Sequence, residues 1–276
     1  MTAWLKLIRL QYSLPLVWPF ALTVWYAAGG DLSGRHASLA WACGAMVSLL
    51  CGTYCLNDVL DVRFDAINAP HRPICSGRIS RRRGAWAAGG FFMAALGLAA
   101  AAGGGFFVAM CLLAGALVGY DFSSKRLGRA KPFIAAALVT AIYPLAFVQA
   151  GGIVGPRAGS LFCFAAWMFL TICGYELFKD IRDRRGDAQS RSAPPLRPRR
   201  YWILGNLTIA LGTLALLPAG GLGMSVAYIP AVLVLVFPIG AWAMFTRRLR
   251  HKFIAVYAEF LAMGIITTLD PLLFGR

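Results

Sequence analysis

The chain has 276 residues, of which 59% are hydrophobic and only 14% are charged, and its mean hydropathy is +0.67. Soluble domains usually carry about 25% charged residues, so the composition excludes an ordinary soluble domain and indicates a protein of the lipid bilayer. The chain has 27 Lys and Arg and 11 Asp and Glu, which gives a formal charge of +16. A charge of this size makes nucleic acid a candidate partner.

Nine apolar stretches are long enough, or nearly so, to cross a hydrocarbon core of about 30 Å as helices. In chain order these predicted spans are 13–30, 37–57, 85–103, 106–122, 132–155, 159–178, 201–221, 224–245 and 253–271. The first apolar run lacks a small-residue cleavage site and leads into further spans, so we expect no cleavable signal peptide. The sequence therefore predicts an all-α, polytopic membrane protein with a single domain over residues 1–276.

The basic residues alternate from one connecting loop to the next. Of the 27 Lys and Arg, 24 precede the first span or lie in alternate loops, and only Arg35, Arg157 and Arg276 fall on the other side. Loops rich in Lys and Arg stay in the cytoplasm, so we expect the N-terminus and the basic loops at the cytoplasmic face of the cell (inner) membrane. Topology and anionic lipid headgroups thus explain the charge. Nucleic acid is excluded as a partner, and nothing indicates an obligate protein partner.

The sequence offers no site for a soft metal ion. Its seven Cys form no CxxC pair, and the three His, at positions 36, 71 and 251, are widely separated. We therefore expect reduced, buried thiols and neither a zinc site nor a haem site.

Seven of the eleven acidic residues occupy two short windows, which we call the first and second acidic stripes. The first stripe contains Asp58, Asp61 and Asp65, and the second contains Glu176, Asp180, Asp183 and Asp187. The spacings i, i+3, i+7 and i, i+4, i+7, i+11 place each set on one face of a helix. Each stripe begins at the cytoplasmic end of a predicted span, the second and the sixth.

Carboxylates gathered on one helix face repel one another unless a positive charge lies between them. A solvated charged face would explain one stripe, but two stripes at matching positions in an acid-poor chain favour a metal site. Mg²⁺ typically takes one or two carboxylates together with waters and substrate phosphates. We expect the two stripes to face each other and to hold Mg²⁺ ions that bridge to a diphosphate, whose remaining oxygens bind Arg and Lys.

The stripes also indicate a weak internal repeat. The order of span, acidic stripe, basic loop and span occurs at 37–103 and again at 159–221. Membrane proteins built from repeats commonly place their site between the halves. The site is expected at the cytoplasmic rim of the bundle.

The segments that carry the stripes resemble the motifs of UbiA-type membrane prenyltransferases. NDVLDVRFDAINAPHRPICSGRIS (57–80) is similar to the family's NDxxDxxxD motif followed by N-x-P-x-R-P-I-x-S-G. KDIRDRRGD (179–187) is similar to KDxxDxxGD, and YDFSSKR (120–126) is similar to Y-S-x-x-x-K-R. Their order and spacing and the predicted spans all agree with the family, so the resemblance covers essentially the whole chain.

The resemblance implies nine transmembrane helices around a central cavity open towards the membrane. Mg²⁺ and an isoprenyl diphosphate would bind at the two motifs, and the prenyl group would pass to a lipophilic acceptor, an aromatic or quinone precursor or a glycerophospholipid-type alcohol. The resemblance implies six metal ligands, which are Asp58, Asp61, Asp65, Asp180, Asp183 and Asp187. Four of them, Asp58, Asp61, Asp180 and Asp183, are also implied to be catalytic. The implied substrate-binding residues are Asn57, Arg72, Tyr120, Lys125, Arg126 and Lys179. Glu176, one turn before the second motif, is a further candidate.

Departures from the family's patterns concern the acceptor. Arg9 leads into LQYSLPL rather than into the R-x-D-K-P-I-G of the 4-hydroxybenzoate branch, which argues against a ubiquinone-pathway enzyme. INAPHRPICSGRIS resembles the branch of digeranylgeranylglyceryl phosphate synthase, chlorophyll synthase and homogentisate prenyltransferases, and KDIRDRRGD favours the first of these over chlorophyll synthase. After Asp187, Arg191 and APPL (193–196) replace the family's Gly and T-L-P, which favours a specialised acceptor.

Two other functions remain open from the residues alone. An intramembrane terpene cyclase on the same scaffold would ionise the diphosphate without a separate acceptor. A transporter would instead place charges near the bilayer midplane, whereas most acids here lie at one rim. Glu259 and Asp270 in the last span are costly in lipid; we expect Asp270 at the outer interface and regard Glu259 as the better functional candidate.

Overall fold

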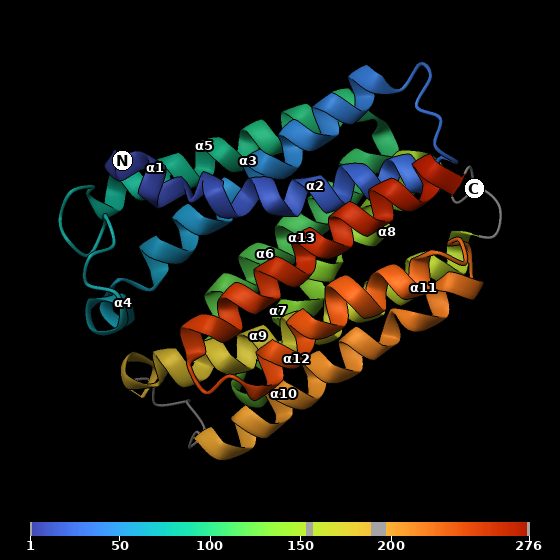
Figure 1. The fold of residues 1–276 in the computed structure, drawn as a ribbon. Coiled ribbons are helices and arrows are strands. Elements are labelled where there is room, and N and C mark those ends of the chain that lie inside the picture. Colours follow the sequence, from blue (N-terminus) through green and yellow to red (C-terminus); the bar gives the residue numbers. More distant parts are fainter. Residues whose placement is uncertain (1, 153–156, 189–196, 275–276) are drawn as a thin grey trace. The chain divides into compact units, whose positions relative to one another are not determined.

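The structure is a computed structural model that describes residues 2–152, 157–188 and 197–274 (Figure 1). Within these ranges every regular element is a helix, which confirms the predicted fold class. In chain order the elements are α1 (Ala3–Ile8), α2 (Leu10–Ala27), α3 (His36–Leu60), α4 (Val62–Asn68), α5 (Arg81–Ala102), α6 (Gly104–Ser123), η1 (Gly128–Ala130), α7 (Lys131–Thr140), α8 (Ile142–Ala150), α9 (Arg157–Asp187), α10 (Pro198–Ala215), η2 (Leu217–Gly221), α11 (Tyr228–Ala231), η3 (Val232–Val236), α12 (Phe237–Phe245) and α13 (Leu249–Phe274).

Eight helical segments among the described residues are long and apolar enough to cross a membrane. They are α3, α5, α6, η1 to α8, α9, α10 with η2, α11 to α12, and α13. The remaining predicted span, 13–30, corresponds largely to α2, whose apolar sequence is interrupted by Gln11 and Ser13 and which carries Pro15 and Pro19 inside the helix. A membrane protein built from apolar helices is thus confirmed, and the count of nine spans is not.

The chain forms two compact units. The first unit lies within Met1–Ala21, Leu32–Arg129 and Asp183–Pro194, and the second within Leu22–Asp31, Ala130–Arg182 and Pro195–Arg276. The last turn of α9 therefore belongs to the first unit, whereas the rest of that helix belongs to the second.

The first unit is built around α3 and α5, which run side by side and both contact α6 (Figure 1). Small residues permit the close approach, because a Cβ atom on Gly52 would lie 3.3 Å from Phe91 and one on Gly44 would lie 3.4 Å from Leu98. Packing of small residues is how apolar helices associate where lipid removes the hydrophobic driving force. At the other end of α5, Ser80 caps the helix by accepting a hydrogen bond from the Arg83 N–H at 3.3 Å.

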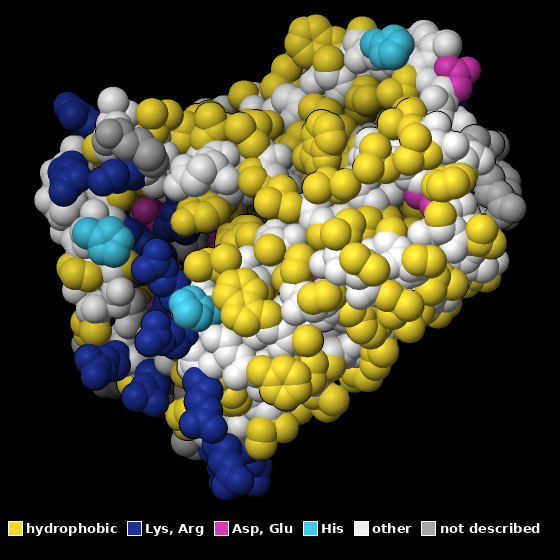
Figure 2. Space-filling model, viewed as in Figure 1, with side chains coloured by type: hydrophobic (Ala, Val, Ile, Leu, Met, Phe, Trp, Pro, Cys, Tyr) yellow, Lys and Arg dark blue, Asp and Glu magenta, His cyan; other side chains and the backbone are white. Residues whose placement is uncertain are grey.

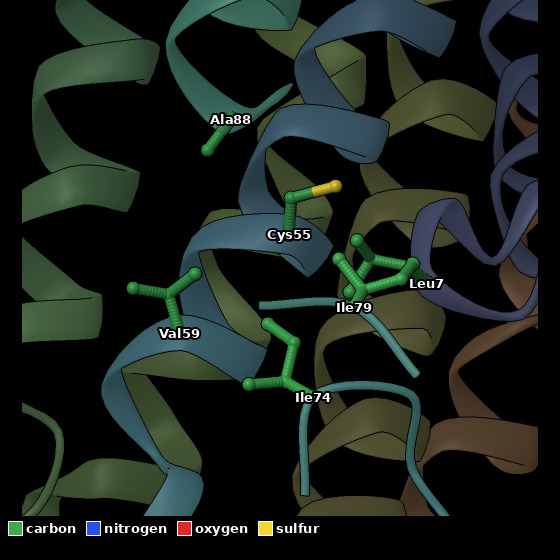
Figure 3. Close-up of a cluster of buried hydrophobic side chains, with 6 residues drawn as sticks. All are labelled: Leu7, Cys55, Val59, Ile74, Ile79 and Ala88. Atoms are coloured by element: carbon green, nitrogen blue, oxygen red, sulfur yellow. The ribbon is translucent and has the colours of Figure 1, made fainter. Parts of the chain in front are cut away.

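A buried cluster joins the loop before α5 to the helices of the first unit (Figure 3). Ile74 and Ile79 from this loop pack with Cys55 and Val59 of α3, and the cluster is completed by Leu7 of α1 and Ala88 of α5. The loop is therefore anchored by apolar burial on both sides of its turn. Arg72, two residues before Ile74, is consequently held close to the end of α3.

In the second unit, α9 packs against α10 through glycines. A Cβ atom on Gly174 would lie 2.7 Å from the carbonyl oxygen of Gly205, and one on Gly205 would lie 2.8 Å from the Phe178 ring. Lys252, fully buried in α13, donates hydrogen bonds to Asn206 at 2.7 Å and to the Ala243 carbonyl in the last turn of α12 at 2.6 Å. A cation at a helix C-terminus is stabilised by the helix dipole, so Lys252 joins α10, α12 and α13.

Hydrophobic side chains cover much of the visible surface (Figure 2). Exposed aliphatic and aromatic side chains lie along the spans, among them Leu112 of α6, Leu261 of α13 and Val234 of η3. An apolar surface of this extent suits contact with lipid rather than with water.

Candidate active site

The first acidic stripe lies at a break between two helices. Asp58 is in the last turn of α3, Asp61 forms the junction with φ −89° and ψ 9°, and Asp65 is in α4. The sequence predicts one continuous helix face, and this detail is wrong because the chain leaves the α conformation at Asp61. Backbone hydrogen bonds nevertheless continue through the junction: the Asp61 N–H donates to the Asn57 carbonyl oxygen at 2.9 Å, and the Asp65 N–H donates to the Asp61 carbonyl oxygen at 2.8 Å. All three carboxylates are therefore buried close to one another, Asp58 with only 1% of its surface exposed.

Cations from three separate segments neutralise this stripe. Arg72 forms ion pairs with Asp65 and with Asp58, at 3.3 Å in the second case. Arg9 also forms an ion pair with Asp58, and Lys125 pairs with Asp61 at 3.3 Å. The mutual repulsion of three buried carboxylates is thus offset by alternating positive charges.

The second acidic stripe lies along the C-terminal part of α9. Its last two members, Asp183 and Asp187, belong to the first unit, where Asp187 pairs with the same Lys125 at 2.9 Å. Lys125 therefore links an acid of the first motif, Asp61, to an acid of the second. Within the first unit the structure brings together carboxylates that are more than 100 positions apart in sequence.

The earlier part of the second stripe lies in the second unit. Asp180 is buried and pairs with Lys131 at 2.6 Å. Glu176 is also buried and pairs with Lys179, one turn along α9, at 3.0 Å. Each buried acid in this part of α9 thus has a basic partner.

The other predicted substrate-binding residues lie around these clusters. The Asn57 Nδ2 atom donates to Asp61 Oδ2 at 3.5 Å, a long hydrogen bond within the α3–α4 junction. Tyr120 is half-buried in α6, and Arg126 is exposed next to Lys125. Among the described residues no ion pair joins Arg126 to an acid, so its predicted role stays a prediction. Arg191 and the APPL segment at 193–196 lie outside the described residues.

Arg9 and Lys131 are two basic residues with acidic partners that no sequence motif marks as site residues. Arg9 ends α1 in the left-handed conformation, with φ 50° and ψ 42°, a strained backbone for a residue other than glycine. Its guanidinium lies 5.2 Å from the Tyr54 ring centre in addition to its contact with Asp58. Lys131 lies five residues after the YDFSSKR motif. Its position in the same basic loop is the sequence feature that could identify it as a site residue.

The donor set of the first stripe fits a hard divalent cation. Asp58 Oδ2 is buried and has no hydrogen-bond partner, which leaves a carboxylate oxygen available for a ligand. No group of three or more His, Cys, Asp or Glu among the described residues is arranged to enclose a metal ion. Mg²⁺ does not need such a cage, because it is usually held by one or two carboxylates with waters and substrate phosphates.

Burial also affects the ionisation of this stripe. Burial raises the pKa of Asp65 to about 6, and the neighbouring Arg72 guanidinium opposes the shift. A nearby cation favours the charged form of a carboxyl group, and a divalent ion does so more strongly than one guanidinium. The stripe is therefore costly to ionise alone and suited to binding positive charge.

Two acids of α13 lie apart from the stripes, in the second unit. Glu259 is fully buried, and its Oε1 atom accepts hydrogen bonds from Trp167 Nε1 at 3.2 Å and from the Thr213 hydroxyl at 2.8 Å. Asp270 is buried inside the protein and accepts hydrogen bonds from the Ser225 N–H at 2.9 Å and from the Ser225 hydroxyl, and its expected place at the outer interface stays a prediction. Both acids thus have polar partners inside the protein, which is how acids are tolerated in apolar spans.

Known proteins resemble this chain in sequence and in fold. Residues 16–263 match the model of the UbiA prenyltransferase family. The digeranylgeranylglyceryl phosphate synthase of Thermococcus gammatolerans is 31% identical over 70% of this chain and 71% of its own length. The protein of the same name from Halobacterium salinarum is 30% identical over 76% of this chain and 77% of its own length. A 4-hydroxybenzoate octaprenyltransferase of Paracidovorax citrulli is 27% identical over 57% of this chain and 50% of its own length.

Solved structures share the fold. The structure of a digeranylgeranylglyceryl phosphate synthase matches with a TM-score of 0.68 at 18% identity, over 96% of this chain and 97% of the other. A UbiA homologue from Archaeoglobus fulgidus bound to GPP and Mg²⁺ matches with a TM-score of 0.63 at 15% identity, over 96% and 99% of the two chains. The family model covers most of the sequence, and the fold agrees with the solved structures along nearly the whole chain. The chain belongs to the UbiA prenyltransferase family.

Proposed function

We propose that this protein is a Mg²⁺-dependent membrane prenyltransferase that moves an isoprenyl group from an isoprenyl diphosphate to a lipophilic acceptor. The observation that carries the proposal is the alternation of acids and cations in the first unit, where Lys125 pairs with buried Asp61 and half-buried Asp187. Acids supply ligands for Mg²⁺, and the interleaved cations supply partners for diphosphate oxygens. A solvated charged face would not need this burial.

The donor is inferred from the site and from relatives. Solved structures described as a UbiA homologue from Archaeoglobus fulgidus are bound to GPP and Mg²⁺, to DMAPP and Mg²⁺, and to Cd²⁺. These ligands support the proposal that this chain binds an allylic diphosphate as the prenyl donor, together with a divalent metal ion. The relatives named digeranylgeranylglyceryl phosphate synthase support a glycerophospholipid-type alcohol as one acceptor class, with an aromatic or quinone precursor as the other.

The proposed ligands for Mg²⁺ are the six aspartates of the two stripes, with Glu176 as a further candidate. They are Asp58, Asp61, Asp65, Asp180, Asp183 and Asp187. When bound, Mg²⁺ supplies positive charge that stabilises the leaving diphosphate.

The chain's own cations act on the same leaving group. Arg72 and Lys125 lie beside carboxylates in the first unit, and Lys179 lies beside Glu176 in the second. Their donors bind diphosphate oxygens and stabilise the negative charge that develops as the allylic C–O bond breaks and its electron pair leaves with the diphosphate. The acceptor's oxygen or carbon then forms the new bond to the prenyl carbon and loses a proton. Asn57, Tyr120 and Arg126 are proposed to contact the substrate from the same region.

The proposal includes the setting of the enzyme. We place it in the cell (inner) membrane with its N-terminus and basic loops in the cytoplasm, and we treat residues 1–276 as one domain. The family match across 16–263 supports a single domain. The charge distribution along the sequence supports the orientation.

The test is product analysis with purified protein in lipid. We expect geranylgeranyl diphosphate with Mg²⁺ and a panel of lipophilic alcohols and phenols to give a prenylated acceptor, and we expect EDTA to abolish product formation. Removal of the acceptor should also stop release of diphosphate. Formation of a cyclic hydrocarbon from the diphosphate alone would contradict the transferase and establish the terpene cyclase instead.

A further inference from the structure

Asn68, the last residue of α4, belongs to neither acidic stripe, yet its side chain binds the backbone of the second one. Its Nδ2 atom donates to the Asp183 carbonyl at 2.8 Å, and its Oδ1 atom accepts from the Gly186 N–H at 2.8 Å. A primary amide carries a donor and an acceptor side by side, so one side chain satisfies both bonds. These four residues, Asn68 with Asp183, Gly186 and the adjacent Asp187, all lie in the first unit.

Gly186 has no room for a side chain at this contact. A Cβ atom there would lie 2.4 Å from Asn68 Nδ2 and 2.7 Å from the Phe64 carbonyl oxygen. The Phe64 carbonyl belongs to the backbone of α4 and does not move aside like the end of a flexible side chain. The close approach of α9 to α4, rather than an unusual backbone conformation, therefore requires glycine at position 186.

The backbone held in this way carries two acids of the second stripe. Asp183 is itself the hydrogen-bond acceptor, and Asp187 follows Gly186 directly. On the other side of the contact, Asp65 lies one turn before Asn68 in α4. The Asn68 amide is thus a direct link between the backbone segments that present the two acidic motifs.

We propose that Asn68 is a positioning residue that fixes the last turn of α9 on α4 and so sets the separation of the acids that hold Mg²⁺ and diphosphate. This inference rests on the proposed function. Asn68 does not touch substrate; it acts through Asp183 and Gly186. Partners outside the metal's own ligands commonly change metal affinity by about 10- to 100-fold when removed, because the ligands lose their orientation.

The test measures binding of Mg²⁺ in the presence of inorganic pyrophosphate, by titration calorimetry on the full chain. We expect Asn68→Ala to raise the Kd for Mg²⁺ by about tenfold or more. Asn68→Leu keeps the volume of the side chain without its bonds and should show the same loss, which keeps the test valid if the smaller residue impairs folding. Gly97→Ala is the control, because a Cβ atom at Gly97 meets nothing within 4 Å.

Three further readouts separate positioning from general destabilisation. Gly186→Ala should raise the Kd as Asn68→Ala does, and the double variant should be little worse than either, because both changes break one contact. Raising Mg²⁺ should restore prenyl transfer in Asn68→Ala, which it would not do for a misfolded protein. Hydrogen exchange of the amides at 184–188 should accelerate in the same variant.

The possible failures are distinct. A wild-type Kd for Mg²⁺ in both folded Asn68 variants overturns the positioning role and leaves the proposed function standing. No binding of Mg²⁺ with pyrophosphate by the wild-type chain overturns the proposed function itself.

Discussion

At the scale of single residues, Asp58 is the least exposed acid of the first stripe. Arg9 and Arg72 both pair with it, and its second oxygen has no hydrogen-bond partner. Two guanidiniums therefore meet at one carboxylate, and Arg72 also pairs with Asp65. We interpret these two arginines as groups ready to bind diphosphate oxygens once Asp58 binds a metal ion.

Replacing Arg9 tests that interpretation. Hydrogen bonds to charged groups contribute about 1.5–3 kcal/mol, which corresponds to a loss of about 10- to 100-fold in kcat/KM for Arg9→Ala. Steady-state kinetics with varied isoprenyl diphosphate measures the loss, and Lys6→Ala, at an exposed position of α1, is the matched control. Equal kcat/KM for Arg9→Ala and the control would remove Arg9 from the site.

Lys131 is the equivalent test in the second unit. Its ammonium group lies 2.6 Å from buried Asp180, so Lys131→Ala removes the ion-pair partner of a buried carboxylate. We expect a loss of transfer activity of at least about tenfold, while Arg129→Ala, at an exposed position two residues earlier, has little effect. Similar activities of the two variants in the same assay would show that the Lys131 pair serves no catalytic purpose.

At the scale of elements, the hydropathy pattern predicts where the long helices lie, but a helix can continue beyond its apolar span. The predicted span 159–178 lies within α9, Arg157–Asp187. A hydropathy window measures apolar length and cannot register helical turns made of charged residues. The spacing of the acids did predict that α9 extends through the second stripe.

Other local features depend on contacts that a sequence pattern does not contain. The break at Asp61 is supported by the loop that brings Arg72 to Asp58 and Asp65. Arg9 and Lys131 become site residues only because folding brings distant segments together. The stripes themselves were visible because acids are scarce in this chain and their spacing is helical.

The packing of α9 on α10 gives a prediction about stability. Gly174→Ala would place a Cβ atom 2.7 Å from the backbone carbonyl oxygen of Gly205, so the two helices must separate. Overpacking of this kind costs about 1–3 kcal/mol, whereas Gly97→Ala in open surroundings should be neutral or slightly stabilising. Thermal unfolding in detergent should therefore show a lower midpoint for Gly174→Ala alone. Equal midpoints for the two variants would contradict the close helix contact.

At the scale of the whole molecule, the charge balance and the enzyme's chemistry are connected. Of the 27 basic residues, 24 are predicted on one side of the membrane, and both acidic stripes lie among them in sequence. An isoprenyl diphosphate has a lipid-soluble chain and a charged head, so a site at the rim of apolar helices suits both parts. The basic loops are therefore expected to share one side with the site.

Labelling of introduced cysteines tests that orientation. Arg82→Cys and Arg35→Cys are both at exposed positions, in loops predicted on opposite sides of the membrane. An impermeant maleimide should label position 35 in intact cells and position 82 only after the membrane is opened. The reverse pattern would place the basic loops outside.

The most direct test of the central claim is diphosphate release during acceptor prenylation by Asp58→Ala and Asp183→Ala, each from one acidic motif. We predict that both variants insert into the membrane and that each loses more than about 100-fold in rate, because the charge developing on the leaving group is no longer stabilised. Asp31→Asn, an acid outside both stripes, should retain the wild-type rate. Wild-type rates in both Asp58→Ala and Asp183→Ala would contradict a metal–diphosphate site at these motifs.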